Sequence, residues 1–231
     1  MKKKNKFMGK SKKITKLVPS KNRQRVHVYL NGEYDFSVEK HLIIEFDLYL
    51  GKVLSDEEKK EIHLRDVERS LYNKCLRKIS RRRHSIKEIR QYLDNKFYKL
   101  EREERKEVSD QQQEEIVKNI IRELSESELL DDLKFAESVI ESKKKKKSRN
   151  EIKQFLIKKR VNSKIIRKAL EQSNIQENEL IKKLVNKKLR LLEHKQLSNK
   201  KKKMKLIQYL ARKGFQFNDI YSVIEEMSEF S

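Results

Sequence analysis

Hydrophobic and polar residues alternate in only one part of the chain, near the N-terminus. Val26–Leu30 and Tyr34–Val38 each alternate, and an Asn-Gly dipeptide joins them. Asn-Gly tolerates the positive φ angles of a type I′ turn, so the pattern predicts a β-hairpin. Ile14–Val18, closed by Pro19, is predicted as a third strand at an edge, where proline is tolerated. This is the only part of the chain for which the pattern predicts β structure.

From about residue 39 onward the pattern is helical. Capping boxes, in which a serine is followed three residues later by a glutamate, occur at Ser55–Glu58, Ser85–Glu88 and Ser148–Glu151. The serine side chain can accept from the backbone of the new helix, and the glutamate can reach back to the serine N–H. Each box therefore predicts the start of a helix.

The same helix pattern recurs behind two of these boxes. Ile89–Leu93 matches Ile152–Leu156, and a third copy, Leu206–Leu210, keeps the Gln-aromatic-Leu order. The third copy has Lys202 where the capping serine is expected. The aromatic residue and the leucine of each copy, such as Phe155 and Leu156, are predicted to be core.

A second helix precedes each copy, and a third helix follows it. The preceding helices share apolar residues at spacing i, i+1, i+4, i+5, which form one stripe on a helix. These stripes begin at Leu71, Phe135 and Leu180, and the following helices carry stripes that begin at Ile116, Ile165 and Ile220. One unit is too small to bury its face alone, so neighbouring units are expected to pack in a row. We predict a mainly α-helical fold: an elongated tandem array of three three-helix repeats with a small N-terminal β-hairpin extension.

This repeat pattern predicts five segments. They are a basic disordered tail (1–13), the hairpin with a helix (14–66), repeat 1 (67–127), repeat 2 (128–173) and repeat 3 (174–231).

Composition agrees with an open helical protein and adds a strong charge. The 231 residues include only four glycines and one proline, and charged residues make up 41%. So few turn residues argue against all-β and collagen-like folds. The net charge of +23 predicts attraction to a polyanion: nucleic acid, a nucleoprotein or an anionic membrane surface. Biased composition, with Lys, Asn and Ile abundant together, is an alternative source of part of this charge.

Nothing in the sequence predicts export or a membrane span. The single cysteine, Cys75, excludes an internal disulfide framework. No apolar run is long enough to cross a bilayer, and the basic N-terminus lacks the apolar stretch of a signal peptide. We expect a cytoplasmic protein with no membrane partner.

The sequence offers no pattern typical of an enzyme. Glycines occur only at positions 9, 32, 51 and 214, which leaves no nucleotide-binding loop. No C-x-x-C or H-E-x-x-H is present, so no metal or other cofactor is predicted. The five histidines are scattered, and Cys75 falls on an apolar stripe, where a small buried residue is expected. Asp131-Asp132 could bind a metal or transfer protons, but an aspartate before a helix caps it, and capping is the favoured interpretation.

Basic clusters recur at the junction between the first and middle helix of each unit. Residues 143–168 and 182–213 each hold thirteen Lys or Arg and one acid, and residues 77–102 hold ten and three. Spaced cations on a row of helices suit a phosphate polymer or an acidic filament, although a single lysine is as well explained by a solvated face. The candidate residues are Arg81, Arg82, Arg83, Arg90, Lys143, Lys144, Lys145, Lys146, Lys147, Arg149, Lys158, Lys159, Arg160, Lys200, Lys201, Lys202, Lys203, Arg212 and Lys213. The aromatic residues of the repeats lie on apolar stripes and are predicted to be core rather than stacking platforms for bases.

Several of these segments resemble the bacterial RecX proteins. Arg81–Leu93 resembles their first repeat, and Leu129–Ser138 resembles their second. Lys188–Arg190 followed by Leu210–Phe215 is similar to the third repeat, and the hairpin is similar to the N-terminal extension of many members. At two places the family often has glycine and this chain does not. Ser127-Glu128 stand ahead of the second-repeat signature, and Arg160 stands after the middle helix of repeat 2. Other departures are His84, where arginine is more usual, and a long insertion at 99–113.

The resemblance implies regulation rather than catalysis. RecX-like proteins bind the RecA recombinase filament on single-stranded DNA and modulate, usually inhibit, its ATP turnover and strand exchange. The resemblance thus implies a monomeric regulator of DNA repair, homologous recombination and the SOS response, with the RecA filament and single-stranded DNA as partners. A second hypothesis, from another class, is a nonspecific DNA- or RNA-binding architectural protein that acts without a recombinase. An enzyme is the third and least supported alternative.

Overall fold

The protein is described by a computed structural model, which covers residues 12–99, 108–193 and 197–227. The chain divides into two compact units, one within Met1–Arg82 and Arg90–Glu126, the other formed by Arg83–Ile89 and Ser127–Ser231. Each unit is described by itself. The prediction of a mainly helical chain with repeated three-helix domains and N-terminal β structure is confirmed.

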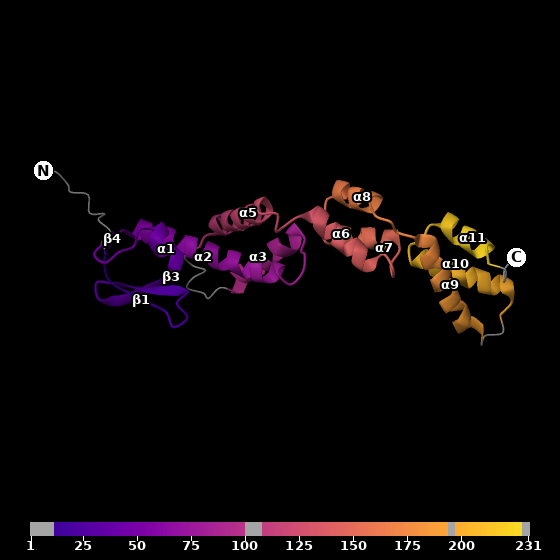
Figure 1. Ribbon diagram of the computed structural model, residues 1–231, viewed down its shortest axis with the longest axis horizontal. Coiled ribbons are helices and arrows are strands. Elements are labelled where there is room, and N and C mark those ends of the chain that lie inside the picture. Colours follow the sequence, from indigo (N-terminus) through magenta and orange to yellow (C-terminus); the bar gives the residue numbers. More distant parts are fainter. Residues whose placement is uncertain (1–11, 100–107, 194–196, 228–231) are drawn as a thin grey trace. The chain divides into compact units, whose positions relative to one another are not determined.

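The N-terminal part is a four-stranded antiparallel sheet with the order β3-β2-β1-β4 (Figure 1). The strands are β1 (Lys12–Pro19), β2 (Arg25–Leu30), β3 (Glu33–Glu39) and β4 (Val53–Leu54). Asn31 and Gly32 connect β2 to β3 and have φ angles of 52° and 92°. Both values match a type I′ turn, so the predicted hairpin is confirmed.

Two details of the sheet differ from the prediction. The strand β1 is not at an edge, because its first residues, Lys12 and Lys13, pair with Leu54 and Val53 of β4. The sequence did not predict β4, which is only two residues long and too short for a recognisable alternation. Lys12 and Lys13 were expected in a disordered tail but belong to β1, while the rest of that segment lies outside the described residues.

One face of the sheet carries the core of this part of the chain. Val28 and Leu30 of β2 and Val38 of β3 are buried there together with Leu42 and Ile62 from the helices α1 (Lys40–Glu45) and α2 (Asp56–Ile79). The helices therefore cover the face that the even-numbered residues of β2 form. The odd-numbered residues point to the opposite face.

The remaining described helices follow the three repeats. They are α3 (Ile86–Lys99), α5 (Asp110–Glu126), α6 (Asp132–Lys143), α7 (Arg149–Lys158), α8 (Ser163–Glu171), α9 (Glu177–Glu193), α10 (Asn199–Arg212) and α11 (Phe217–Glu225). Figure 1 shows α6, α7 and α8 grouped as one bundle and α9, α10 and α11 as another. Each of these bundles has its own buried cluster, around Ile152 and Leu156 in the first and around Leu206 and Leu210 in the second.

All three predicted capping boxes are present. In α2 and α7 the serine accepts from the backbone N–H of the glutamate, and the glutamate side chain accepts from the serine N–H. Ser85 and Glu88 make the same pair of bonds at 3.2 and 3.4 Å. The third repeat differs, since α10 begins at Asn199, about one turn before the position of the missing serine, and its N-cap Ser198 makes no side-chain capping bond.

Three residues between helices adopt a left-handed backbone. Gly214 after α10 has φ +79°, Arg160 after α7 has φ +54°, and Glu128 ahead of α6 has φ +55°. Arg160 and Glu128 lie at the positions where the resemblance would place glycine. The loops thus keep the conformation that favours glycine although the side chains have changed.

Candidate interaction surface

The predicted basic residues lie in the turns and helix ends that join first to middle helices. Arg81, Arg82 and Arg83 are exposed between α2 and α3, and Lys145 and Lys146 are exposed between α6 and α7. In the third repeat the lysines of the cluster lie inside α10 because that helix starts early: Lys200 and Lys201 are exposed, and Lys202 and Lys203 are half-buried. The candidate residues at the far ends of the middle helices are Lys158, Lys159, Arg160, Arg212 and Lys213.

Some of these cations are held by carboxylates of the chain itself. Arg90 pairs with Glu114, and Lys159 Nζ lies 2.7 Å from Glu88 Oε1. Lys144 and Lys147 make ion pairs along their own helix ends, with Glu141 at 2.7 Å and Glu151 at 2.8 Å. Within the described residues, no ion pair involves Lys145, Lys146, Lys200 or Lys201. Lys158 is also exposed and takes part in no ion pair of the described chain, so these five lysines are the candidate ammonium groups most available to a polyanion.

Each repeat places two lysines against one aromatic ring. In the first repeat Lys78 and Lys96 lie 4.8 and 5.3 Å from the ring centroid of Tyr92. In the others, Lys143 and Lys159 lie 4.5 and 5.6 Å from Phe155, and Lys188 and Lys213 lie 5.3 and 5.5 Å from Tyr209. The second lysine follows the aromatic residue by four positions in every case, so one helix turn sets this spacing.

This arrangement corrects part of the core prediction for the three rings. Phe155 and Tyr209 pack against their bundle cores on one side, but all three rings are only half-buried. The exposed ring surface attracts the lysine ammonium groups by the cation–π interaction. Leu156, next to Phe155, is fully buried as predicted. The repeats thus fix six lysine side chains at equivalent surface positions.

A serine hydroxyl at the start of α3, and another at the start of α7, joins that middle helix to the next repeat. Ser85 Oγ donates to the carbonyl oxygen of Lys159 at 3.2 Å, and Ser148 Oγ donates to the carbonyl oxygen of Lys213 at 2.7 Å. Lys159 and Lys213 are the C-cap residues of α7 and α10. The positive N-terminal end of one helix therefore meets the negative C-terminal end of the next, which favours the contact. Each serine both accepts within its own helix and donates to its neighbour.

A backbone amide makes a second contact at each of these two joints, the places where Ser85 and Ser148 contact the next repeat. The N–H of Ile86 donates to Asp132 Oδ1, and the N–H of Arg149 donates to Glu177 Oε1, each at 2.9 Å. Asp132 and Glu177 are the first residues of α6 and α9. Burial raises the pKa of Asp132, which the Ile86 N–H opposes and the Asp131 carboxylate reinforces. The same two-point joint thus occurs twice.

The acidic pair that the sequence singled out is accounted for by these contacts. Asp131 caps α6 by accepting from the N–H groups of Leu133 and Lys134, and Asp132 accepts from Ile86. Within the described parts of the chain, no three His, Cys, Asp or Glu side chains form a group that could hold a metal. Burial raises the pKa of the Cys75 thiol to about 12, the opposite of what a thiolate nucleophile requires.

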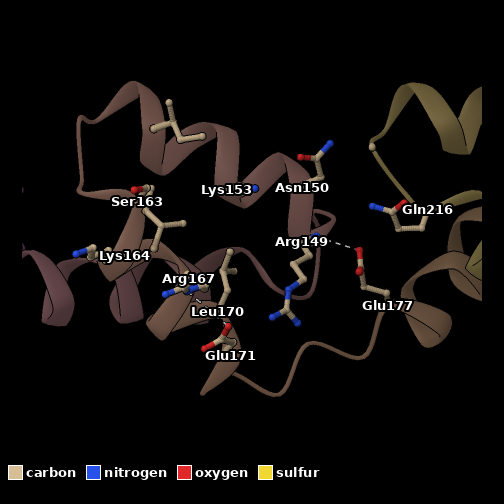
Figure 2. Close-up of a pocket in the computed structure, with 13 residues that line it drawn as sticks. Arg149, Asn150, Lys153, Ser163, Lys164, Arg167, Leu170, Glu171, Glu177 and Gln216 are labelled. Carbon is tan, nitrogen blue, oxygen red and sulfur yellow. Dashed lines mark hydrogen bonds and ion pairs between the residues drawn. The ribbon is translucent and has the colours of Figure 1, made fainter.

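A cleft of about 500 Å³ opens beside the second of these joints (Figure 2). Its cations come from α7 and α8, where Arg149 and Lys153 lie one turn apart, as do Lys164 and Arg167. Glu171 and Glu177 lie among them, and the close-up shows the bond from Arg149 to Glu177. The remaining lining includes Ile157, Ile166 and Leu170.

Sequence reasoning named Arg149 but missed the other three cations of the cleft. Lys153, Lys164 and Arg167 sit in helices rather than in the turn that carries the longest lysine run. The spacing of cations at i, i+4 on α7 and i, i+3 on α8 was the available signal, because it places them on one face of each helix. The faces of α7 and α8 line one cleft because of the contacts of Ser148 and Arg149 with the next repeat. The sequence pattern did not predict those contacts.

Together these features define a class: a tandem three-helix-repeat protein with a basic surface repeated from unit to unit. None of the helices in the described ranges is long and apolar enough to span a membrane. Three family models match the chain: the regulatory protein RecX N-terminal domain at residues 12–55, the RecX second three-helix domain at 131–170 and the RecX third three-helix domain at 176–224. The chain belongs to the RecX family.

Individual relatives agree with this assignment over almost the whole chain. The regulatory protein RecX of Leuconostoc mesenteroides is 31% identical over 94% of this chain and 76% of its own length. That of Clostridium perfringens strain SM101 is 29% identical over 94% of this chain and 96% of its own length. A crystal structure of a regulatory protein RecX matches with a TM-score of 0.74 and 26% identity, covering 93% of this chain and all of the other. The names of these relatives describe regulators.

Proposed function

We propose that this chain modulates the RecA recombinase by binding its filament on single-stranded DNA. The expected effect is lower ATP turnover and strand exchange, in the cytoplasm and with the chain as a monomer. Membership of the RecX family supports this proposal. The regulation would occur through binding, since the chain supplies neither an activated thiol nor, among its described residues, a metal-binding group.

The observation that carries the proposal is the repetition of one basic arrangement in all three repeats. A recombinase filament presents the same subunit and the same phosphates again and again. The lysines at Tyr92 and Tyr209, and Lys143 at Phe155, offer a cationic position in every repeat, while the second lysine at Phe155 is paired with Glu88. Each repeat could bind weakly, and the covalent linkage would make the sum tight because later contacts form at a high effective concentration.

The candidate surface consists of the cations that the structure leaves exposed. Lys145 and Lys146 represent repeat 2 and Lys200 and Lys201 represent repeat 3, with Arg81 as the equivalent in repeat 1. Lys144, Lys147 and Lys159 contribute less in this proposal because carboxylates already neutralise them. The contacts would be mainly electrostatic and therefore sensitive to salt.

One observation favours a second function, nonspecific binding to DNA or RNA without a recombinase. Residues 143–168 and 182–213 each carry thirteen cations and one acid, enough to bind any phosphate polymer. The two functions differ in whether the protein binds the RecA filament more tightly than bare nucleic acid.

Two binding isotherms at the same salt concentration distinguish these functions. Binding of the full chain is measured to bare single-stranded DNA and to the RecA filament assembled on the same strand. Modulation of the recombinase predicts tighter binding to the filament and a fall in ATP turnover at saturating protein. Equal or weaker binding to the filament, with ATP turnover unchanged, would contradict the proposal and support nonspecific binding.

A further inference from the structure

The exposed face of the N-terminal sheet carries a group of aromatic side chains that the core does not use. Tyr29 pairs with Tyr34 across β2 and β3, and His27 pairs with Ser37 on the other side of a register shift between Val28 and Tyr29. These residues lie on the face opposite Val28 and Leu30, which pack against the helices. None of the three rings belongs to that buried cluster. Tyr34 is 58% exposed.

The three rings are fixed relative to one another. Tyr34 lies edge-to-face against both neighbours, with centroids 5.9 Å from His27 and 6.0 Å from Tyr29. Ser37 Oγ lies 2.6 Å from His27 Nδ1 and 3.1 Å from the Tyr34 phenol oxygen, so it links the two rings by hydrogen bonds. The arrangement is therefore organised before any ligand arrives, which lowers the entropic cost of binding.

The charge of this face is positive. Lys16 of β1 pairs with Tyr29 and places its Nζ 5.5 Å from the centre of that ring. The turn from β1 to β2 adds Lys21 and Arg23, both exposed. The register places Lys16, Val18, His27, Tyr29, Tyr34 and Ser37 on this face, and none of them is a carboxylate. Glu39, the partner of Arg25 at the end of β3, accepts hydrogen bonds from Asn73 of α2 with both carboxylate oxygens. Arg25 at the end of β2 is neutralised by Asp66, 2.7 Å away, and so adds no free positive charge.

We propose that this face, the tyrosine face of Lys16, His27, Tyr29 and Tyr34, binds unpaired bases of single-stranded DNA. Aromatic side chains beside cations suit such a strand because bases stack on the rings while ammonium groups contact the phosphates. A duplex hides its base faces in the helix stack, so it cannot use the rings in this way. This site differs in position and chemistry from the basic surface of the repeats, and it does not rest on the proposed action on the recombinase.

The test separates stacking from phosphate binding by using two probes. Fluorescence anisotropy measures binding of the full chain to a labelled oligothymidylate and to an abasic strand of equal length, without recombinase. The basic repeats can contact the phosphates of both strands, but only the first strand offers bases. The ratio of the two affinities therefore reports stacking alone.

Tyr34→Ala is the main variant, since an exposed side chain can be removed without opening the core. We expect it to weaken oligothymidylate binding by roughly 5- to 150-fold, the range for loss of one base–aromatic stack, with little change on the abasic strand. Tyr34→Phe keeps the ring and should bind as the parent does. Tyr49→Ala removes a tyrosine of similar exposure, 55%, outside this face and should also bind normally.

Two outcomes would overturn the inference. One is a Tyr34→Ala protein, folded by circular dichroism, that prefers oligothymidylate over the abasic strand as strongly as the parent. The other is equal loss on both strands, which would show that the ring does not stack on bases. Because the assay contains no recombinase, its failure leaves the proposed modulation of RecA untouched.

Discussion

Ser148 Oγ donates a hydrogen bond of 2.7 Å to the carbonyl oxygen of Lys213, the residue that ends the middle helix of the next repeat. The same serine oxygen accepts from the N–H of Glu151 at the start of its own helix. One hydroxyl thus serves as a helix cap and as a link between repeats. Ser85 and Lys159 repeat this relationship.

Removing this hydroxyl should destabilise the protein. We expect Ser148→Ala to lower the free energy of unfolding by about 1–2 kcal/mol, because it removes a helix cap and leaves the Lys213 carbonyl without its donor. Urea unfolding followed by circular dichroism measures the change. Ser198→Ala is the matched control, since Ser198 occupies the N-cap of α10 without making a side-chain capping bond. Equal losses in the two variants would show that the link contributes nothing.

Glycine should improve the turn after α7. Arg160 has φ +54°, a region that costs an ordinary L-residue about 1–2 kcal/mol, and glycine avoids most of that cost. We expect Arg160→Gly to raise the free energy of unfolding by up to about 1 kcal/mol. Lys158→Gly, at the last helical residue of α7, should lower it by up to about 1 kcal/mol. A loss of stability in Arg160→Gly would contradict this account of the turn.

Asp132 should make the stability of the second unit depend on pH. Burial raises its folded-state pKa, so the folded protein holds this proton more tightly than the unfolded chain does. The resulting stabilisation is fully present below the unfolded pKa and is lost as the pH rises through the folded pKa. Asp132→Asn keeps an acceptor for Ile86 and removes the titration. We expect it to match or exceed the parent in unfolding free energy at pH 7, with any advantage vanishing below about pH 4.

Unfolding curves of the two proteins across this pH range provide the measurement. A parent that gains stability relative to the variant as the pH rises would show that the ionised Asp132 stabilises the fold, against the sign expected here.

Leu156 and Phe155 should differ although both were predicted as core. Leu156 is fully buried, so Leu156→Ala should cost about 2–5 kcal/mol of unfolding free energy. Phe155 packs on one side only, so Phe155→Ala should cost roughly 1–2 kcal/mol. Urea titration of the two variants tests the difference. Equal costs would mean that the ring is as deeply packed as the leucine.

Local patterns in the sequence predicted the local structure well. The Asn31-Gly32 turn, the three capping boxes and the recurrence of the middle helix each depend on residues a few positions apart, and each is present. The two-residue strand β4 was missed because its pairing with Lys12 and Lys13 bridges some forty positions of the chain. No periodicity over two residues can signal such a contact.

The residue types of the candidate surface were predictable from the sequence, but the carboxylates and rings that its lysines contact were not. Lysine runs identified Lys145, Lys146 and Lys200, which the structure shows as exposed. The ion pair of Lys159 with Glu88 spans 71 positions, and no local pattern in the sequence indicates that Glu88 neutralises this lysine. The sharing of one ring by two lysines was also missed, since it depends on which side of Phe155 faces solvent. Tertiary packing decides both features.

In the proposed function, exposed cations repeated from unit to unit bind the recombinase filament. Lys145→Glu with Lys146→Glu removes two of them in repeat 2, and Lys200→Glu with Lys201→Glu removes two in repeat 3, where acidic residues suit the first turn of a helix. Lys40→Glu with Lys60→Glu makes the same change in net charge at exposed positions outside the repeat clusters.

The most direct measurement is the salt dependence of filament binding for these three double variants and the parent. Each lost phosphate contact lowers the slope of log affinity against log salt by about 0.7 on a single strand. We expect weaker binding, a flatter slope and less inhibition of ATP turnover for the two repeat variants, with the control close to the parent. Folded repeat variants that match the control in affinity, slope and inhibition would contradict the proposed function.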